Sequence, residues 1–105
     1  MATPPEAHPF ALFERFGVEL EYMIIDRATM DVRPIADEVI RAITGSYTSD
    51  AEPEGEDGEI SWSNELVAHV IELKTQHPAA SLAGLGDRFH DHVQKINAIL
   101  EPMGA

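Results

Sequence analysis

Residues 17–24 have the sequence Gly-Val-Glu-Leu-Glu-Tyr-Met-Ile, in which apolar residues alternate with others. The even-numbered residues of this stretch, Val18 to Ile24, are all apolar, and the odd-numbered residues between them include Glu19 and Glu21. This period of two predicts a β-strand with one apolar face and one face that carries two carboxylates. The apolar face must be covered in the folded protein, and the rest of the chain has to supply the cover.

The predicted cover is a helix near the end of the sequence. Apolar residues recur there in steps of three and four, and they form one continuous stripe: Leu82, Leu85, Phe89, Val93, Ile96, Leu100 and Met103. This spacing predicts an amphipathic helix. Pro102 predicts that the helix ends near Leu100 or Glu101. We expect the stripe to pack on the apolar face of residues 17–24.

Two further segments between the strand and this helix are predicted to be ordered. Residues 34–44 predict a helix, with Pro34 at its first position and Gly45 at its C-cap. Residues 60–75 are rich in β-branched and aromatic side chains, which predicts either one bent strand or two short ones. The order β-α-β(β)-α gives a small α/β domain of the α+β type. Its sheet of two or three strands would be half covered and would leave its edges exposed.

The chain is long enough for one domain. It has 105 residues and a mass of 11.6 kDa, which is too little for two domains. Residues 1–15 are predicted to be a loose leader, because residues 1–9 contain three prolines. Residues 16–105 form the domain. Within it, residues 48–59 are expected to be a solvated acidic loop, since residues 50–59 carry six acids and no base.

Charge and composition exclude several classes of partner. The formal net charge is −12, which disfavours binding to nucleic acids and to anionic membranes. The chain has no cysteine, so any divalent metal must be held by oxygen or histidine nitrogen. No apolar run approaches the roughly 20 residues that span a bilayer, and the N-terminus lacks the features of a signal peptide. We therefore expect a cytoplasmic protein.

The first candidate site is the carboxylate pair of the opening strand. Glu19 and Glu21 point to the same face, roughly 6.5–7 Å apart along the strand. Two carboxylates at this spacing suit a hard cation such as Mg²⁺. The alternative is a strand surface that faces solvent. Met23 and Ile25 share the face of the two carboxylates, which favours a strand covered on both sides.

The second candidate is Glu72, which lies between Ile71 and Leu73 in a nearly continuous apolar run. Such a run predicts a strand buried on both faces, where a carboxylate needs a partner. That partner is either a metal ion or Lys74, two residues further along the same face.

Glu65 is a less secure candidate for the same site. In one continuous strand, alternation places it on the face opposite to Glu72. The two can share a site only through a bulge or if the strand begins after Glu65. In the continuous strand, Asn64 is the alternative residue on the side of Glu72.

The histidines give a weaker signal. His90 and His92 are two apart on the predicted helix and point about 200° apart, so they cannot share a metal. We expect both to be surface or boundary residues. His69 lies nearer to Glu72 in sequence, but alternation places it on the other face.

Two stretches resemble signature motifs of the glutamate–cysteine ligase superfamily, in its bacterial carboxylate–amine ligase branch. Residues 17–26 resemble its opening strand, Gly-(Val/Ile)-Glu-x-Glu followed by apolar residues. Residues 70–75, Val-Ile-Glu-Leu-Lys-Thr, resemble its second signature, an apolar pair followed by Glu-(Leu/Phe)-x-Thr. Residues 34–39 resemble the helix start that lies between them in the family. The resemblance covers residues 16–105.

This resemblance implies a glutamine-synthetase-like fold, in which an antiparallel sheet with helices on one face carries carboxylates that hold Mg²⁺ (or Mn²⁺) over ATP. It implies that Glu19, Glu21 and Glu72 are metal ligands, and it matches Glu65 to an acid that relatives carry seven residues earlier. The implied reaction phosphorylates a substrate carboxylate, and an amine then displaces the phosphate to form an amide. Glutamate–cysteine ligases serve glutathione biosynthesis in this way. The metals neutralise charge on the transferring phosphoryl group.

Family members are several times longer than this chain. The resemblance therefore implies the N-terminal portion of a ligase, or a stand-alone relative, that is inactive by itself. Its small-molecule substrates, an amino acid and an amine, would bind in the complete protein. The alternative is a non-catalytic acidic module that forms homo-oligomers through its exposed sheet edges or docks on a partner.

Overall fold

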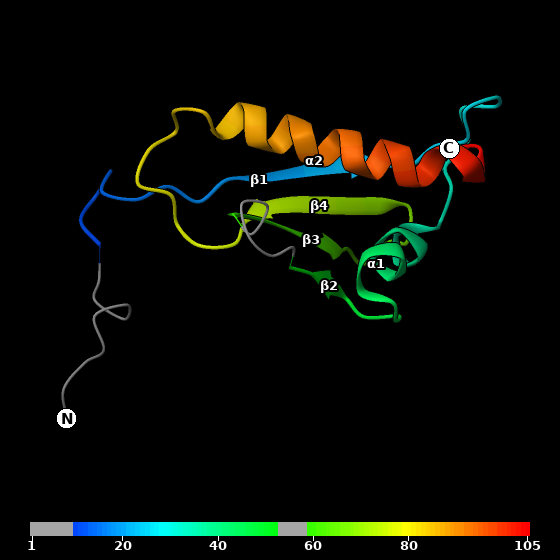
Figure 1. Ribbon diagram of the computed structural model, residues 1–105, viewed down its shortest axis with the longest axis horizontal. Coiled ribbons are helices and arrows are strands. Elements are labelled where there is room, and N and C mark those ends of the chain that lie inside the picture. The colour runs from blue at the N-terminus through cyan, green and yellow to red at the C-terminus, as the bar shows by residue number, and fades with distance from the viewer. Residues whose placement is uncertain (1–9, 53–58) are drawn as a thin grey trace.

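The computed structural model describes residues 10–52 and 59–105 of the chain. This part is a small α+β fold, with one antiparallel sheet of four strands in the order β1-β4-β3-β2 and two α-helices (Figure 1). The elements in chain order are β1 (Glu19–Met23), α1 (Ala36–Thr44), β2 (Asp50–Ala51), β3 (Ile60–Asn64), β4 (Val70–Thr75) and α2 (Leu85–Leu100), followed by the 3₁₀-helix η3 (Glu101–Met103).

Strand β2 corrects the expectation that residues 48–59 form only a solvated loop. Asp50 and Ala51 pair with Ser63 and Trp62 of β3. Ala51 is fully buried, because its small apolar side chain lies on the same face as the indole opposite it. Residues 53–58 of the expected loop, and residues 1–9 of the expected leader, lie outside the described part of the chain.

Residues 60–75 form two short strands and not one bent strand, the two alternatives that the sequence left open. Strands β3 and β4 pair antiparallel, with Trp62 opposite Leu73 and Ser63 opposite Glu72. Residues 65–69 connect the two strands, and the amide of Val70 donates to the carbonyl of Val67. The chain therefore reverses direction directly after Asn64.

Both helices end close to where the sequence predicts. Helix α1 is capped by Gly45, which adopts φ +80° and donates its amide to the carbonyl of Arg41. This left-handed conformation favours glycine. Helix α2 ends at Leu100 as predicted. It begins at Leu85 rather than at Leu82, because Gly84 takes φ +74° before the first helical residue, and Leu82 is 55% exposed.

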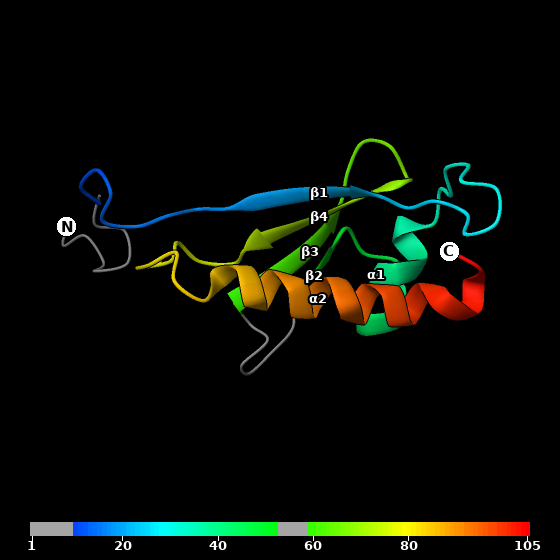
Figure 2. The ribbon, with the colours of Figure 1, turned by 90° about the horizontal axis from the view of Figure 1, so that it is seen from above.

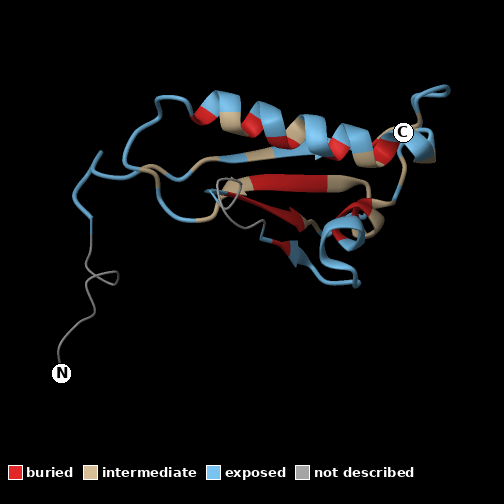
Figure 3. Ribbon diagram, in the orientation of Figure 1, coloured by how far each residue is buried: buried red, intermediate tan, exposed pale blue. Residues whose placement is uncertain are grey.

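The core lies between the sheet and the two helices, which contact each other (Figure 2). Four stripe residues of α2 are buried in this core: Leu85, Phe89, Ile96 and Leu100. The predicted cover of residues 17–24 is confirmed only in part, because α2 contacts the sheet mainly through β3 and Tyr22 is 40% exposed. Buried positions lie along β3, β4 and one side of α2, whereas β1 is exposed or half-buried (Figure 3). Val18 and Leu20 pack at its margin.

His92 corrects a second expectation. It is 2% exposed rather than a surface residue, and its Nδ1 accepts a hydrogen bond of 2.8 Å from Nε1 of the buried Trp62. The two rings meet edge to face, with centroids 5.9 Å apart. A buried indole N–H needs an acceptor, and His92 supplies it from α2. His90 is exposed, as expected.

No helix in the described ranges, 10–52 and 59–105, has the length and hydropathy needed to cross a membrane.

Candidate metal centre

The strand register assigns each side chain to one of two faces. In an antiparallel pair, residues directly opposite each other point to the same side of the sheet. One row across the four strands consists of Leu20, Leu73, Trp62 and Ala51. This row faces the helices, since Trp62 bonds to α2. The adjacent row therefore points away from the helices: Glu21, Glu72, Ser63 and Asp50.

Three carboxylates converge on this open face. One side-chain oxygen from each of Glu21, Glu65 and Glu72 lies within 4.8 Å of the other two. Among the described residues, this is the one such group of three histidine, aspartate or glutamate side chains. The members come from β1, from the β3–β4 connection and from β4. Three sequence-distant segments thus bring oxygen ligands to one point.

Glu65 reaches this point because it lies outside regular strand structure. Strand β3 ends at Asn64, so the alternation that would send the side chain of Glu65 to the other face no longer applies. This is the second of the two possibilities that the sequence leaves open, a strand that begins after Glu65.

Asn64 is placed differently from the expectation. It pairs with Ile71, whose side chain belongs to the face covered by α2, so Asn64 does not share the face of Glu72. The reason is the chain reversal, which resets the alternation between β3 and β4. Ser63 takes that position opposite Glu72 and is 6% exposed. The sequence alone gave no sign of Ser63, because its placement depends on where the connection lies.

Glu19 lies on the open face but outside the group of three. It is opposite Lys74 in the next row across the sheet. Glu19 and Glu21 are both exposed, and Met23 on the same face is 62% exposed. The expectation that β1 is covered on both faces is therefore wrong for the described part of the chain, because both helices pack on the other side.

Glu72 is the buried member of the group. Its side chain is 9% exposed, and Ile71 and Leu73 beside it are also buried, as the apolar run predicts. The pKa of Glu72 is raised from its ordinary value of 4.5 to about 7. Burial is the largest cause; a hydrogen bond with Glu65 and the negative charges of Glu19 and Glu65 act in the same direction, while Lys74 acts against them. Burial and repulsion from the neighbouring carboxylates therefore disfavour the ionised form of Glu72.

Lys74 compensates only part of this charge. Its Nζ lies 4.0 Å from Oε1 of Glu72, and its side chain is 36% exposed. At this distance the contact is at the outer limit of an ion pair. The expected alternative partner of Glu72 is thus present, as a long contact from a partly exposed side chain.

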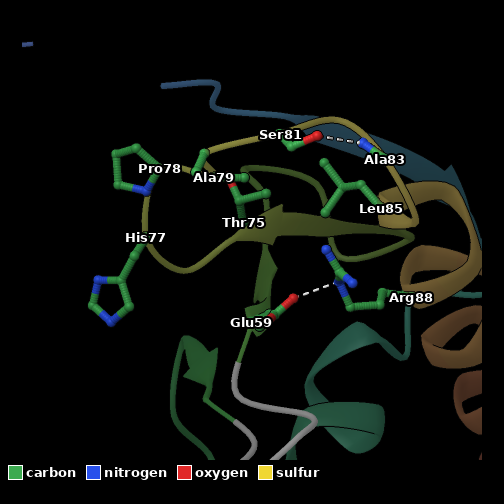
Figure 4. A pocket seen from close by; sticks show the side chains of 10 residues that line it. Glu59, Thr75, His77, Pro78, Ala79, Ser81, Ala83, Leu85 and Arg88 are labelled. Carbon is green, nitrogen blue, oxygen red and sulfur yellow. Dashed lines mark hydrogen bonds and ion pairs between the residues drawn. The ribbon is translucent and has the colours of Figure 1, made fainter. Parts of the chain in front are cut away.

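Two hollows lie near the sheet ends. One, of about 400 Å³, adjoins Glu19, Lys74 and Thr75. The other, of about 430 Å³, lies between the end of β4 and the start of α2 (Figure 4). Its two charged residues, Glu59 and Arg88, form an ion pair with each other. The opposite charges of this hollow therefore compensate each other.

Comparison with known proteins gave no match: no protein-family model fits the chain, and no curated protein or solved structure is significantly similar to it.

Proposed function

We propose that this chain is the metal-binding N-terminal part of an ATP- and Mg²⁺-dependent carboxylate–amine ligase of the glutamate–cysteine type, with a glutamine-synthetase-like sheet. One observation carries the proposal. Glu21, Glu65 and Glu72, which the motifs single out with Glu19, meet on the open face of an antiparallel sheet.

The spacing of the carboxylates suits a small cation after slight closure. Mg²⁺ binds oxygen at about 2.0–2.1 Å in octahedral geometry, so two of its ligand oxygens lie about 3–4 Å apart. The three oxygens here lie within 4.8 Å of one another. Two of the three side chains are outside the buried core of the sheet and can adjust: Glu21 is exposed and Glu65 is half-buried.

The electrostatics also favour a cation. Three carboxylates share one point, and Lys74 at 4.0 Å is a weak counter-charge. A divalent ion would relieve the repulsion and allow Glu72 to ionise despite its burial. Ser61 and Ser63 border the site on β3. Both are uncharged, so they bring no positive charge that would compete with a metal ion.

In the proposed reaction, the γ-phosphoryl group of ATP transfers to a substrate carboxylate and gives an acyl phosphate and ADP. The nitrogen of the amine then displaces inorganic phosphate and forms the amide. Bound metal would supply charge neutralisation for the phosphoryl group. The residues of this chain hold the metal and position it. We expect no ligation by the 105 residues alone.

Calorimetric titration of Mg²⁺ and Mn²⁺ into the purified chain, with and without ATP, tests the proposal. The test variant is Glu21→Gln/Glu72→Gln. The matched control is Asp91→Asn/Glu101→Gln, which removes two exposed carboxylates elsewhere. Saturable binding that only the test variant loses would support the metal site. Equal loss in both variants, or no binding by the folded chain, would contradict it.

The alternative function is a non-catalytic acidic module. It is favoured by one observation, the outer edge of β1, which no other strand of residues 10–52 and 59–105 pairs with; such an edge can pair with another chain. Sedimentation analysis separates the self-associating form of this module from the ligase part. A dimer whose formation requires the β1 edge, in a chain that binds no metal, would favour the module.

A further inference from the structure

The outer edge of β1 has backbone groups arranged for a further strand. The amide of Thr75 donates to the carbonyl of Val18, and the amide of Ile24 donates to the carbonyl of His69. Ladder bonds of an antiparallel pair recur at every second residue, so the even-numbered residues of β1 face β4. The backbone N–H and C=O groups of Glu19, Glu21 and Met23 therefore point outward. Within the described residues, no strand pairs with this edge.

An apolar groove runs beside the same edge. It has a volume of about 390 Å³ and lies between Leu20 and Tyr22 of β1 and the α2 residues Phe89 and Val93. Tyr22 is 40% exposed. A strand added to β1 would alternate its side chains. One set would enter this groove, and the other would lie beside Glu19 and Glu21 on the open face.

Charge decides which strand fits. A second copy of this chain, paired antiparallel about Glu21, would place two Glu21 side chains opposite each other and bring together two molecules of charge −12 each. Like charges directly opposite destabilise a strand pair. Basic side chains opposite Glu19 and Glu21 would be attracted instead, both locally and by the field of the whole chain.

We propose that the free edge of β1 and the groove beside it bind an extended segment of another polypeptide as a fifth strand, with basic residues at alternate positions and apolar residues between them. Backbone hydrogen bonds would supply the pairing, and the alternating side chains would supply the specificity. The proposal does not depend on metal binding, since the edge and the groove are formed by the chain alone.

Hydrogen exchange on the full ¹⁵N-labelled chain tests this directly. The probe is a short capped peptide in which lysine alternates with valine and leucine, added in metal-free buffer with a chelator. At saturation, the amides of Glu19, Glu21 and Met23 should exchange at least about tenfold more slowly. The amides of Leu20 and Tyr22 already bond to β4 and should change little. Binding without protection of the three outward amides would overturn the proposal, as would the absence of binding.

A matched pair of variants tests the role of charge. Glu19→Lys should weaken peptide binding about tenfold, because it turns one cross-strand attraction into repulsion. Glu101→Lys makes the same change in net charge on exposed η3 and should weaken binding less than about twofold. Equal effects would show that the peptide only senses net charge and would overturn the proposal. Protection of the β1 edge that rises with protein concentration in the absence of peptide would identify a second copy as the occupant and would also overturn it.

Discussion

The two faces of the sheet use the same strands for different purposes. On the covered face, Leu20, Leu73, Trp62 and Ala51 form a row beneath the helices. On the open face, the adjacent row contains Glu21 of β1, Glu72 of β4 and Ser63 of β3. Alternation along each strand separates the two rows completely. One face stabilises the fold, and the other is left for polar chemistry without interrupting the core.

The largest contrast between the faces should appear in stability. Trp62→Ala removes a fully buried indole and should lower the free energy of unfolding by about 3–5 kcal/mol. Ser63→Ala changes the next residue on the opposite face and should alter it by less than about 1 kcal/mol. Urea denaturation followed by circular dichroism measures both. Similar losses in the two variants would contradict the division into a structural face and a chemical face.

His92 offers a sharper test within the covered face. His92→Leu introduces an apolar side chain of similar size and leaves Nε1 of Trp62 without its acceptor. A buried unsatisfied donor costs about 1–3 kcal/mol. His90→Leu, at an exposed position two residues earlier, should change stability by less than about 0.5 kcal/mol. Thermal denaturation compares the two, and an equally tolerant His92 would mean that the hydrogen bond contributes nothing.

The buried carboxylate of the open face should make the stability of the chain depend on pH. The pKa of Glu72 is raised from 4.5 to about 7 in the folded chain, so between these values the folded state retains a proton that the unfolded state releases. In metal-free buffer, this group therefore makes the chain progressively less stable as pH rises from 4.5 to 7, with no further change above that range. Glu72→Gln should lack this component, so its stability relative to the parent chain should grow between pH 4.5 and 7. A constant difference across this range would contradict the burial of a strained carboxylate.

The smallest expected effect separates Glu19 from the group of three. Glu19 lies one row away, opposite Lys74, and acts on the site mainly through its charge. Glu19→Gln should weaken Mg²⁺ binding by a few-fold, whereas Glu21→Gln should weaken it by at least about tenfold. Calorimetry distinguishes these outcomes. If Glu19→Gln weakens binding more than Glu21→Gln does, Glu19 contacts the ion directly and the group of three carboxylates does not describe the site.

The sequence predicts those features that depend on local periodicity. The period-two stretch at 17–24, the cap at Gly45 and the stripe of α2 all correspond to observed structure. Strand β2 has no such local pattern, because a two-residue strand exists only through its pairing with β3. The burial of His92 had a local signal, since His92 lies three residues after Phe89 and four before Ile96, in line with the apolar stripe.

The candidate site was less predictable because it depends on where the chain reverses. Glu72 could be singled out by its apolar neighbours. Its relation to Glu65 and to Asn64 required the position of the β3–β4 connection, which no residue between 60 and 75 marks with glycine or proline. A carboxylate just outside a strand escapes the alternation rule, so only the folded chain shows which acids meet.

Paramagnetic relaxation by Mn²⁺ tests the central claim, that the open face holds a divalent cation, most directly. Substoichiometric Mn²⁺ is added to the ¹⁵N-labelled chain, and the loss of amide signal is followed residue by residue. We expect the amides of Glu21, Glu65 and Glu72 to broaden first, and Glu21→Gln/Glu72→Gln to abolish this selectivity. Broadening that begins at other acids, or that spreads evenly over the acidic surface, would contradict it.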